Sequence, residues 1–555
     1  TITSRFGFSF NHSYSHSYSR IYYNNQWANA EKPTVSQSSP QRAYWQWENF
    51  ANYLKSFGRH NLGAMVGISY SEDTSQSLST SINEISMNDE NFAWIDFAGG
   101  NATKTISGIE TQTRKFSYFG RLNYNYDERY FIEASVRADA ADLSVLPLAE
   151  RWGVFPAVSA GWVLTNEEFI PKNDVLSYFK LRASWGQNGS IANLSNYMYA
   201  SAIESNDKYP FDGSYSVGSS PSSLGNPHLK WETSEQTDIG FDARFFSNRL
   251  SLTFDAYIKK TKDLIVNNST PSLSAGNTPS PINAGNIENR GIEVDLSWRS
   301  HIGDLQYSIS GNFSTLHNEV TYLDPTIERI SGSRGPIGEG GQGIYFEKGY
   351  PAWYMRGYHV VGVDPETGNA IFDDVNDDNA IDANDLQMIG SGIPTFNYGL
   401  TINLAYKGFD FVLFGSGAAG NDIWYACTYN NVTGANTLKY FYDNRWTPSN
   451  RNASIARPGT NEVNKYYSSD AYVFDGSYFK IKQIQLGYTI PENITRRAHI
   501  SKIRAYVSLD DFFTFTNYPG LDPESASISS MNGIGVDTGN YPQSRKVVFG
   551  INVTF

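Results

Sequence analysis

Cysteine, long apolar runs and basic stretches are all scarce in this sequence of 555 residues. The single cysteine, Cys427, excludes a disulfide within the chain and therefore a small scaffold held together by disulfides. No segment approaches about 18 consecutive apolar residues, the length that indicates a transmembrane helix. The net charge of -13 and the lack of any basic run argue against nucleic acid as a partner, because phosphate binding needs a basic surface.

Aromatic residues, by contrast, are abundant. Tyr (37), Phe (33) and Trp (12) make up 15% of the chain, although its mean hydropathy is only -0.43. Soluble cores rely mainly on Leu, Ile and Val, whereas transmembrane β-barrels have aromatic girdles at both interfaces and a polar lumen. Since lipid cannot satisfy an open sheet edge, we predict an all-β fold, a closed transmembrane antiparallel β-barrel surrounded by outer-membrane lipid.

Alternation of apolar and polar residues with a period of two is the main local pattern. In residues 249–258 one face would carry Leu250, Leu252, Phe254, Ala256 and Ile258, and the other Ser251, Thr253, Asp255 and Tyr257. Residues 545–555 alternate in the same way. A soluble sandwich and a barrel both give such strands, so the connections have to distinguish them.

The links between strands alternate in length. Tight turns such as Phe57-Gly58, Asp127-Glu128 and Lys407-Gly408 alternate with long polar loops, of which 318–392 is the longest. We expect every short link on one side and every long link on the other, as in outer-membrane barrels with short periplasmic turns and long extracellular loops. This reading gives sixteen strands, at about 3–12, 42–56, 59–72, 113–125, 128–139, 152–164, 176–187, 232–246, 249–262, 285–300, 304–317, 393–406, 408–420, 476–490, 500–513 and 545–555.

The start of the chain, Thr1-Ile2-Thr3, leads directly into an alternating segment and has no signal peptide. We therefore expect residues 1–555 to be the C-terminal part of a larger barrel. A porin of sixteen strands would be complete here, whereas a transporter of about 22 strands with a plugged lumen would need six more strands and a plug upstream. The abrupt start favours the second interpretation.

One loop motif has the spacing of a calcium site. Within the loop 318–392, residues 374–385 match the twelve-residue calcium loop at positions 1, 3, 5, 9 and 12, with a backbone carbonyl at position 7. The expected ligands of a structural Ca²⁺ are Asp374, Asn376, Asp378, Ala380, Asp382 and Asp385. Asn379 stands where Gly is usual, and position 12 is Asp in place of Glu. The alternative is an acidic surface loop of Asx-turns without metal.

Several longer motifs occur in a fixed order between residues 113 and 555. They include Trp152-Gly153-Val154-Phe155-Pro156-Ala157, Leu181-Arg182-Ala183-Ser184-Trp185-Gly186, Asn226-Pro227-His228-Leu229-Lys230-Trp231-Glu232, Leu486-Gly487-Tyr488-Thr489-Ile490-Pro491 and Asn517-Tyr518-Pro519-Gly520-Leu521-Asp522-Pro523-Glu524. Together these motifs resemble the SusC/RagA family of TonB-dependent transporters of Bacteroidetes. Residues 1–112 fit only as barrel strands.

The resemblance implies a location in the bacterial outer membrane and import of oligosaccharides or peptides. It also implies a SusD-like surface lipoprotein as partner, and energy from the TonB–ExbB–ExbD complex acting on an N-terminal part outside this chain. Rival hypotheses are a passive porin, a TonB-dependent siderophore or cobalamin receptor, and a SusC-like barrel that serves as a structural subunit of an assembly or secretion complex.

No catalytic site is apparent, because nucleophile elbows, phosphate-binding glycine loops and CxxC motifs are all missing from the sequence. We therefore predict that the protein is not an enzyme. Aromatic residues in the outer loops would either stack on sugar rings or pack the loops together, and packing is the preferred interpretation. These residues are Tyr345, Phe346, Trp353, Tyr354, Trp424 and Tyr425. Substrate-binding residues are not identifiable from the sequence.

Overall fold

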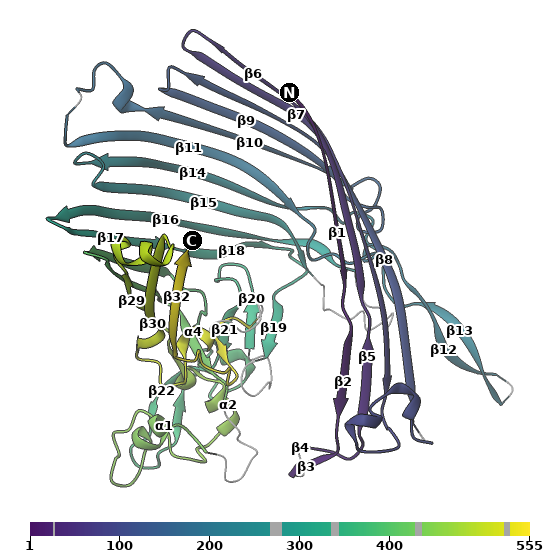
Figure 1. Cartoon of the computed structure of the whole chain (residues 1–555). Coiled ribbons are helices and arrows are strands. Elements are labelled where there is room, and N and C mark those ends of the chain that lie inside the picture. Colours follow the sequence, from purple (N-terminus) through teal and green to yellow (C-terminus); the bar gives the residue numbers. More distant parts are fainter. Residues whose placement is uncertain are drawn as a thin grey trace.

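One antiparallel sheet of nineteen strands dominates the computed structural model (Figure 1). The structure describes residues 1–555 except 26–27, 101, 172, 212, 267–279, 335–342, 428–435 and 527–532. Figure 1 shows a curved sheet, with loop elements such as α1, α2 and β22 gathered in the lower half of the view. In the described part of the chain, no helix has the length and apolar character needed to cross a membrane.

Sixteen strands form a continuous wall in which each strand pairs with its neighbours in the chain. The predicted number and order of strands are confirmed. The first and last strands, β1 and β32, do not pair with each other in the described part of the chain. The described sheet is therefore an open wall, and the six further strands of a closed barrel remain a prediction. The wall strands are β1 (Ile2–His12), β6 (Gln41–Phe57), β7 (His60–Ile82), β8 (Lys104–Tyr126), β9 (Tyr130–Ala140), β10 (Trp152–Val163), β11 (Leu176–Ser190), β14 (Glu232–Phe245), β15 (Leu250–Val266), β16 (Ile282–Ile302), β17 (Leu305–Thr315), β25 (Phe396–Tyr406), β26 (Phe409–Ala419), β29 (Tyr478–Thr489), β30 (Lys502–Thr516) and β32 (Lys546–Thr554).

Alternation along the strands separates two faces of the wall. Ile239 of β14 lies opposite Ala256, which in turn lies opposite Ile292 of β16, and both isoleucines are exposed. On the next row, Asp255 lies opposite Glu293, so the other face is polar. Exposed apolar side chains on one face and charged side chains on the other are what a lipid-facing barrel wall with a hydrated lumen requires.

Most short links lie on one side of the wall and most long links on the other, but the separation by length is not strict. Lys407 and Gly408 both have positive φ, as do Asp127 and Glu128, which is typical of the tightest hairpin turns. On the same side, however, the links 164–175 and 490–501 contain short helices and exceed the outer link 141–151. The prediction that every short link lies on one side is therefore wrong at these positions, because periplasmic turns can also hold compact structure.

Two wall strands are much longer than predicted. The strands β7 and β8 each have 23 residues and pair from His60–Tyr126 to Ile82–Lys104. Apart from a few aliphatic residues such as Leu78, Ile106 and Ile109, their outer halves are polar on both faces, so the regular apolar alternation that marks lipid contact ends before the strands do. A bilayer crossing needs only about 9–11 residues, and the outer halves therefore stand above the membrane.

Most of the remaining elements lie on the loop side of the wall, but α3 (Glu492–Thr495) lies in the link 490–501 on the tight-turn side. Three strands extend the main sheet: β2 (Ser15–Ser19), β5 (Thr34–Ser38) and β18 (His317–Leu323), the last of which begins where the loop 318–392 was predicted. The small sheets contain β3 (Tyr22–Asn25), β4 (Ala28–Ala30), β12 (Ile203–Phe211), β13 (Ser214–Pro221), β19 (Ile330–Arg334), β20 (Gly343–Phe346), β21 (Tyr354–Gly357), β22 (Val360–Val363), β23 (Ala370–Phe372), β24 (Gln387–Gly390), β27 (Asp422–Tyr425), β28 (Val473–Asp475) and β31 (Val536–Asp537). The α-helices are α1 (Lys439–Asn444), α2 (Val463–Tyr467), α3 (Glu492–Thr495) and α4 (Pro523–Ala526).

A buried carboxylate fixes the membrane edge of the wall on the tight-turn side. Glu167, in the link after β10, accepts hydrogen bonds from the Tyr130 hydroxyl at 2.5 Å and from the Trp162 indole at 2.9 Å. Arg129 donates to its other oxygen at 3.1 Å. The rings of Tyr130 and Trp162 stack with centroids 6.2 Å apart. Girdle aromatics with their polar ends satisfied in this way are typical of a membrane interface.

Replacement of Glu167 by Ala should lower the free energy of unfolding by about 1–3 kcal/mol, since three donors lose their acceptor. Urea unfolding in lipid vesicles, followed by tryptophan fluorescence, measures this change. Glu168→Ala is the matched control, because the side chain of Glu168 is 90% exposed and lies 4.0 Å from Arg129. Equal unfolding curves for the two variants would contradict a stabilising role for Glu167.

Candidate functional site: the lumen wall and the outer cap

The polar face of the wall forms the candidate passage. A cavity of about 740 Å³ opens on this face and is lined in part by Glu133, Lys180, Arg182, Asp238 and Asp255. The Arg182 guanidinium lies 2.9 Å from a carboxylate oxygen of Asp255 and 2.9 Å from one of Asp242. Apolar side chains, including Leu54 and Phe131, line the same cavity, so it offers a solute charged, hydrogen-bonding and apolar contacts.

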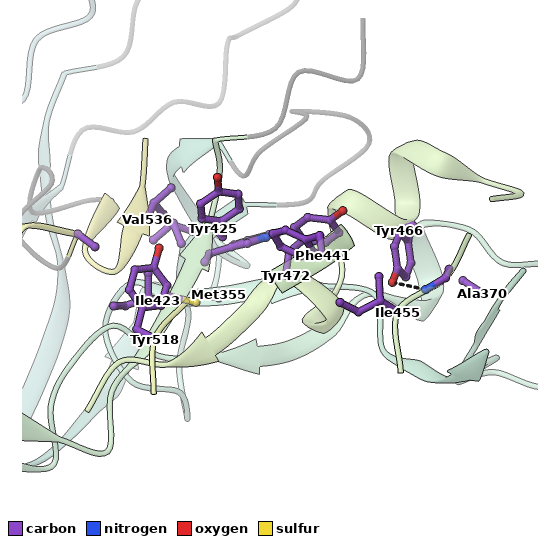
Figure 2. Close-up of a cluster of buried hydrophobic side chains, with 14 residues drawn as sticks. Met355, Ala370, Ile423, Tyr425, Phe441, Ile455, Tyr466, Tyr472, Tyr518 and Val536 are labelled. Carbon is purple, nitrogen blue, oxygen red and sulfur yellow. Dashed lines mark hydrogen bonds between the residues drawn. The ribbon is translucent and has the colours of Figure 1, made fainter. Parts of the chain in front are cut away.

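Among the described residues, the largest buried apolar cluster lies outside the wall, in a region that we call the outer cap. The outer cap is built from the three long loops that follow β18, β26 and β30. Figure 2 shows side chains from all three loops pointing toward one another. The cluster contains Ile344, Met355, Ala370, Ile423, Trp424, Tyr425, Phe441, Ile455, Ala456, Tyr466, Tyr472, Tyr518, Ala526 and Val536.

Backbone pairing joins the three loops further, and buried hydroxyls brace the second and third loops internally; the amide of Tyr358 in the first loop, for example, donates to the carbonyl of Ser468 in the second at 3.1 Å. The strand β27 pairs with β28 of its own loop and in parallel with β31 of the last loop. The Ala456 amide donates to the Tyr466 hydroxyl at 2.9 Å (Figure 2), and burial raises the pKa of Tyr466 to about 12. The Tyr518 hydroxyl donates to Asp537. The outer cap is therefore a folded unit and not three independent loops.

The aromatic residues predicted in the outer loops are mostly buried; Trp424 and Tyr425 belong to the outer-cap cluster, and Phe346 belongs to a second buried cluster. Trp424 is 0% exposed, and Tyr345, Phe346, Tyr354 and Tyr425 are buried. Trp353 is half-buried and packs against Phe346 with ring centroids 5.5 Å apart. Packing, the preferred interpretation of these residues, is confirmed.

A buried ion cluster attaches the last cap loop to the wall. Lys480 of β29 is 2% exposed, and its Nζ lies 3.1 Å from Asp522 and 3.0 Å from Glu524. Lys482, on the same face of β29, also pairs with Glu524. The amide of Gln543 donates to Asp522 at 3.0 Å. In the sequence, Asp522 and Glu524 stand out only as part of a family motif, although two lysines two residues apart on a strand indicate that acidic partners are needed.

The calcium-loop motif forms a compact turn at the edge of the outer cap. Asp374 accepts hydrogen bonds from the amides of Asp378 at 3.2 Å and Asn379 at 2.7 Å. Asp385 is buried and accepts from the amides of Val375 at 2.9 Å and Asp382 at 2.7 Å. The loop therefore folds back so that its first and last acidic positions serve its own backbone.

The residues of this loop fit a hard cation in donor type but have not converged on one point. Asn379 has φ of +65°, the left-handed conformation that Gly supplies in calcium loops. Asp378 accepts from Ala380 and Asp382 from Asn384, at 2.8 and 2.7 Å, which are Asx-turn contacts. In the described part of the chain, no group of three or more His, Cys, Asp and Glu side chains is arranged to hold a metal.

Comparison with known proteins identifies the family. The family model for "TonB dependent receptor-like, beta-barrel" proteins matches residues 1–508. The chain belongs to this family. TonB-dependent receptors are outer-membrane proteins and not enzymes, so the predicted location and the predicted lack of enzymatic activity are confirmed.

Individual relatives of this TonB-dependent receptor agree with the SusC/RagA resemblance. TonB-dependent receptor P3 of Formosa agariphila is 31% identical over 530 residues, covering 92% of this chain and 52% of the relative. TonB-dependent receptor SusC of Bacteroides thetaiotaomicron is 29% identical over 458 residues, covering 80% of this chain and 44% of the relative. The chain thus spans about half the length of the curated relatives that it matches.

A solved structure has the same fold. The RagAB peptide transporter superimposes with a TM-score of 0.84 at 23% identity, and the match covers 100% of this chain and 60% of the other. This likeness confirms the fold of the receptor's wall and outer loops.

Truncation of Trp424 to Ala should open the outer cap without unfolding the wall. A fully buried Trp replaced by Ala typically costs about 3–5 kcal/mol. Limited trypsin digestion should then cleave faster at Arg445 and Arg451, two basic residues of the same loop. Tyr541→Ala is the control, because Tyr541 is 85% exposed and its loss should leave the digestion pattern unchanged. Equal digestion of the two variants would show that the outer cap is not held by its apolar interior.

Proposed function

We propose that the chain is the wall and outer cap of a SusC-like importer of oligosaccharides or peptides. The observation that carries this proposal is its membership of the TonB-dependent receptor family together with relatives of the SusC and RagA type. The polar face of the wall suits solutes that hydrogen-bond strongly, and its cavity adds apolar contacts. The large outer cap suits substrates that are too big for a simple porin and need a selective mouth.

In this function, the chain binds the substrate and guides it along the wall, and other proteins and the rest of the receptor supply the energy. A SusD-like surface lipoprotein works with the outer loops, and the TonB–ExbB–ExbD complex acts through a part of the protein outside this chain. The hydrated wall offers alternating donors and acceptors along the strands, so a polar substrate exchanges water for protein hydrogen bonds as it passes. No bond in the substrate is broken.

Genetic deletion and uptake assays test the proposal. Removal of the full-length receptor, or of a neighbouring lipoprotein, should abolish growth on the same oligosaccharide or peptide mixture. Growth on the corresponding monomers, which porins admit, is the control and should be unchanged.

Other results would replace the proposal with one of its rivals. Loss of ferric-siderophore or cobalamin uptake alone would indicate a receptor of that class. Unchanged growth on every mixture, with assembly or secretion proteins bound to the purified receptor, would indicate a structural subunit.

We further propose that residues 374–385 bind a structural Ca²⁺ that braces the outer cap. The oxygens of Asp374, Asn376, Asp378, Asp382 and Asp385 and the carbonyl of Ala380 would hold it. Two features support the proposal: the spacing of the oxygen donors and the left-handed Asn379. Bound Ca²⁺ would replace the like-charge repulsion of four carboxylates with attraction, and it would not take part in catalysis.

Calcium titration by calorimetry provides the test. Asp374→Asn should weaken Ca²⁺ binding at least tenfold, since it removes a charged ligand at position 1. Asp377→Asn is the matched control, because Asp377 is exposed, lies outside the ligand positions, and has a positive φ that Asn tolerates. If the unaltered receptor binds no Ca²⁺, or if both variants bind equally, the loop is an Asx-turn structure without metal.

A further inference from the structure

The outer half of β8 is an unpaired edge of the main sheet. The strand β8 pairs with β7 along its whole length, from Lys104 to Tyr126. Its other side pairs with β9 only from Phe116 to Tyr126, because β9 ends at Ala140. In Figure 1, β8 extends well beyond the end of β9. Among the described residues, no strand pairs with that side of β8 between Lys104 and Lys115.

The direction of the unpaired backbone groups follows from one hydrogen bond. The amide of Arg114 donates to Asp142 at 3.0 Å, in the chain segment just after β9. The amide of Arg114 therefore points away from β7. Backbone groups alternate sides along a strand, so the amides and carbonyls of Gln112, Glu110, Gly108 and Ile106 also point to the open side.

This edge carries charged side chains at Lys104 and Glu110, but it lacks two other usual protections of edge strands. It contains no proline, and its pairing with β7 runs without a bulge. Ile106 is 72% exposed and Ile109, on the opposite face, is 64% exposed. Long, flat edges with exposed aliphatic side chains pair readily with other chains, and native proteins cover or disrupt them. A partner strand would satisfy this edge.

The position of the edge restricts the partner to the cell surface. The base of β8 that pairs with β9, a strand of 11 residues, already has the length of a bilayer crossing. The open edge lies beyond it on the side of the long loops. Regularly spaced amides and carbonyls are matched by another extended polypeptide and not by a glycan or by lipid.

We propose that the edge of β8 from Lys104 to Gln112 binds an extended strand of the surface lipoprotein, which adds to the main sheet by β-augmentation. This inference rests on the proposed function for the identity of the partner. The lipoprotein strand pairs with the outward backbone groups of Ile106, Gly108, Glu110 and Gln112. Its side chains lie beside Ile106 on one face and Ile109 on the other.

A pair of variants at Gly108 tests the edge directly. Gly108→Pro removes an outward amide while leaving the hydrogen bonds to β7, whereas Gly108→Ala keeps that amide. A Cβ at Gly108 meets no atom closer than 3.7 Å, so alanine fits. The full-length receptor is purified with and without the lipoprotein, and amide hydrogen exchange is measured for residues 104–112.

The lipoprotein should slow exchange of these amides at least tenfold in the unaltered receptor and in Gly108→Ala, but not in Gly108→Pro. Unchanged protection of residues 116–126 establishes that each variant keeps its folded wall. A complex in which residues 104–112 exchange as fast as in the receptor alone overturns the edge inference and leaves the proposed function standing. Failure of the unaltered receptor to bind the lipoprotein overturns the partner assignment itself.

A photo-crosslinking residue placed at Ile106 identifies the neighbour in intact cells. Crosslinks to the lipoprotein support the inference. Crosslinks to a second copy of the receptor, or to a substrate peptide, overturn it.

Discussion

Backbone hydrogen bonding in a medium without water is the constraint on which this structure depends. Inside the bilayer every amide and carbonyl needs a partner from the protein, so the sixteen wall strands pair in unbroken sequence order. Above the membrane that constraint ends. There the chain forms small separate sheets, short helices and, along β8, an unpaired edge. The variety of the outer region is a consequence of its contact with water.

The protein has its apolar residues in two arrangements with different causes. Isoleucines such as Ile239 and Ile292 face outward because their solvent is lipid. Trp424 and Met355 are buried among loop residues because their solvent is water. The hydrophobic effect that folds a soluble domain therefore operates here in the outer cap and in three smaller buried clusters. This division explains why the wall of a large membrane protein has no central core of its own.

Much of the wall was predictable from the sequence, because lipid on one face and water on the other produce a strict period of two. The prediction ended β7 at residue 72, ten residues short of Ile82, since the outer part of that strand is mostly polar on both faces and shows no regular alternation. The fold of the outer cap was not predictable for a related reason. Its interior joins residues as distant as Met355 and Val536, and no local pattern records contacts between separate loops.

The candidate site was likewise predictable only where its residues are close in the sequence. The calcium-loop spacing is local, so residues 374–385 stood out, and Asn379 has the expected left-handed backbone. The ion cluster of Lys480, Asp522 and Glu524 joins a wall strand to a distant loop and went unrecognised. A local motif predicts local geometry. A salt bridge between distant segments cannot be predicted in this way, because the sequence shows the two charged residues but not that they meet.

That ion cluster also limits how the mouth of the barrel can move. Separation of the last loop from β29 would break the ion pairs of the buried Lys480 ammonium with Asp522 and Glu524, so the cluster opposes that movement. The flank of the rim beside β29 and β30 is thus the stationary one. A wider entrance would therefore need the other outer loops to move while the last loop stays attached to β29.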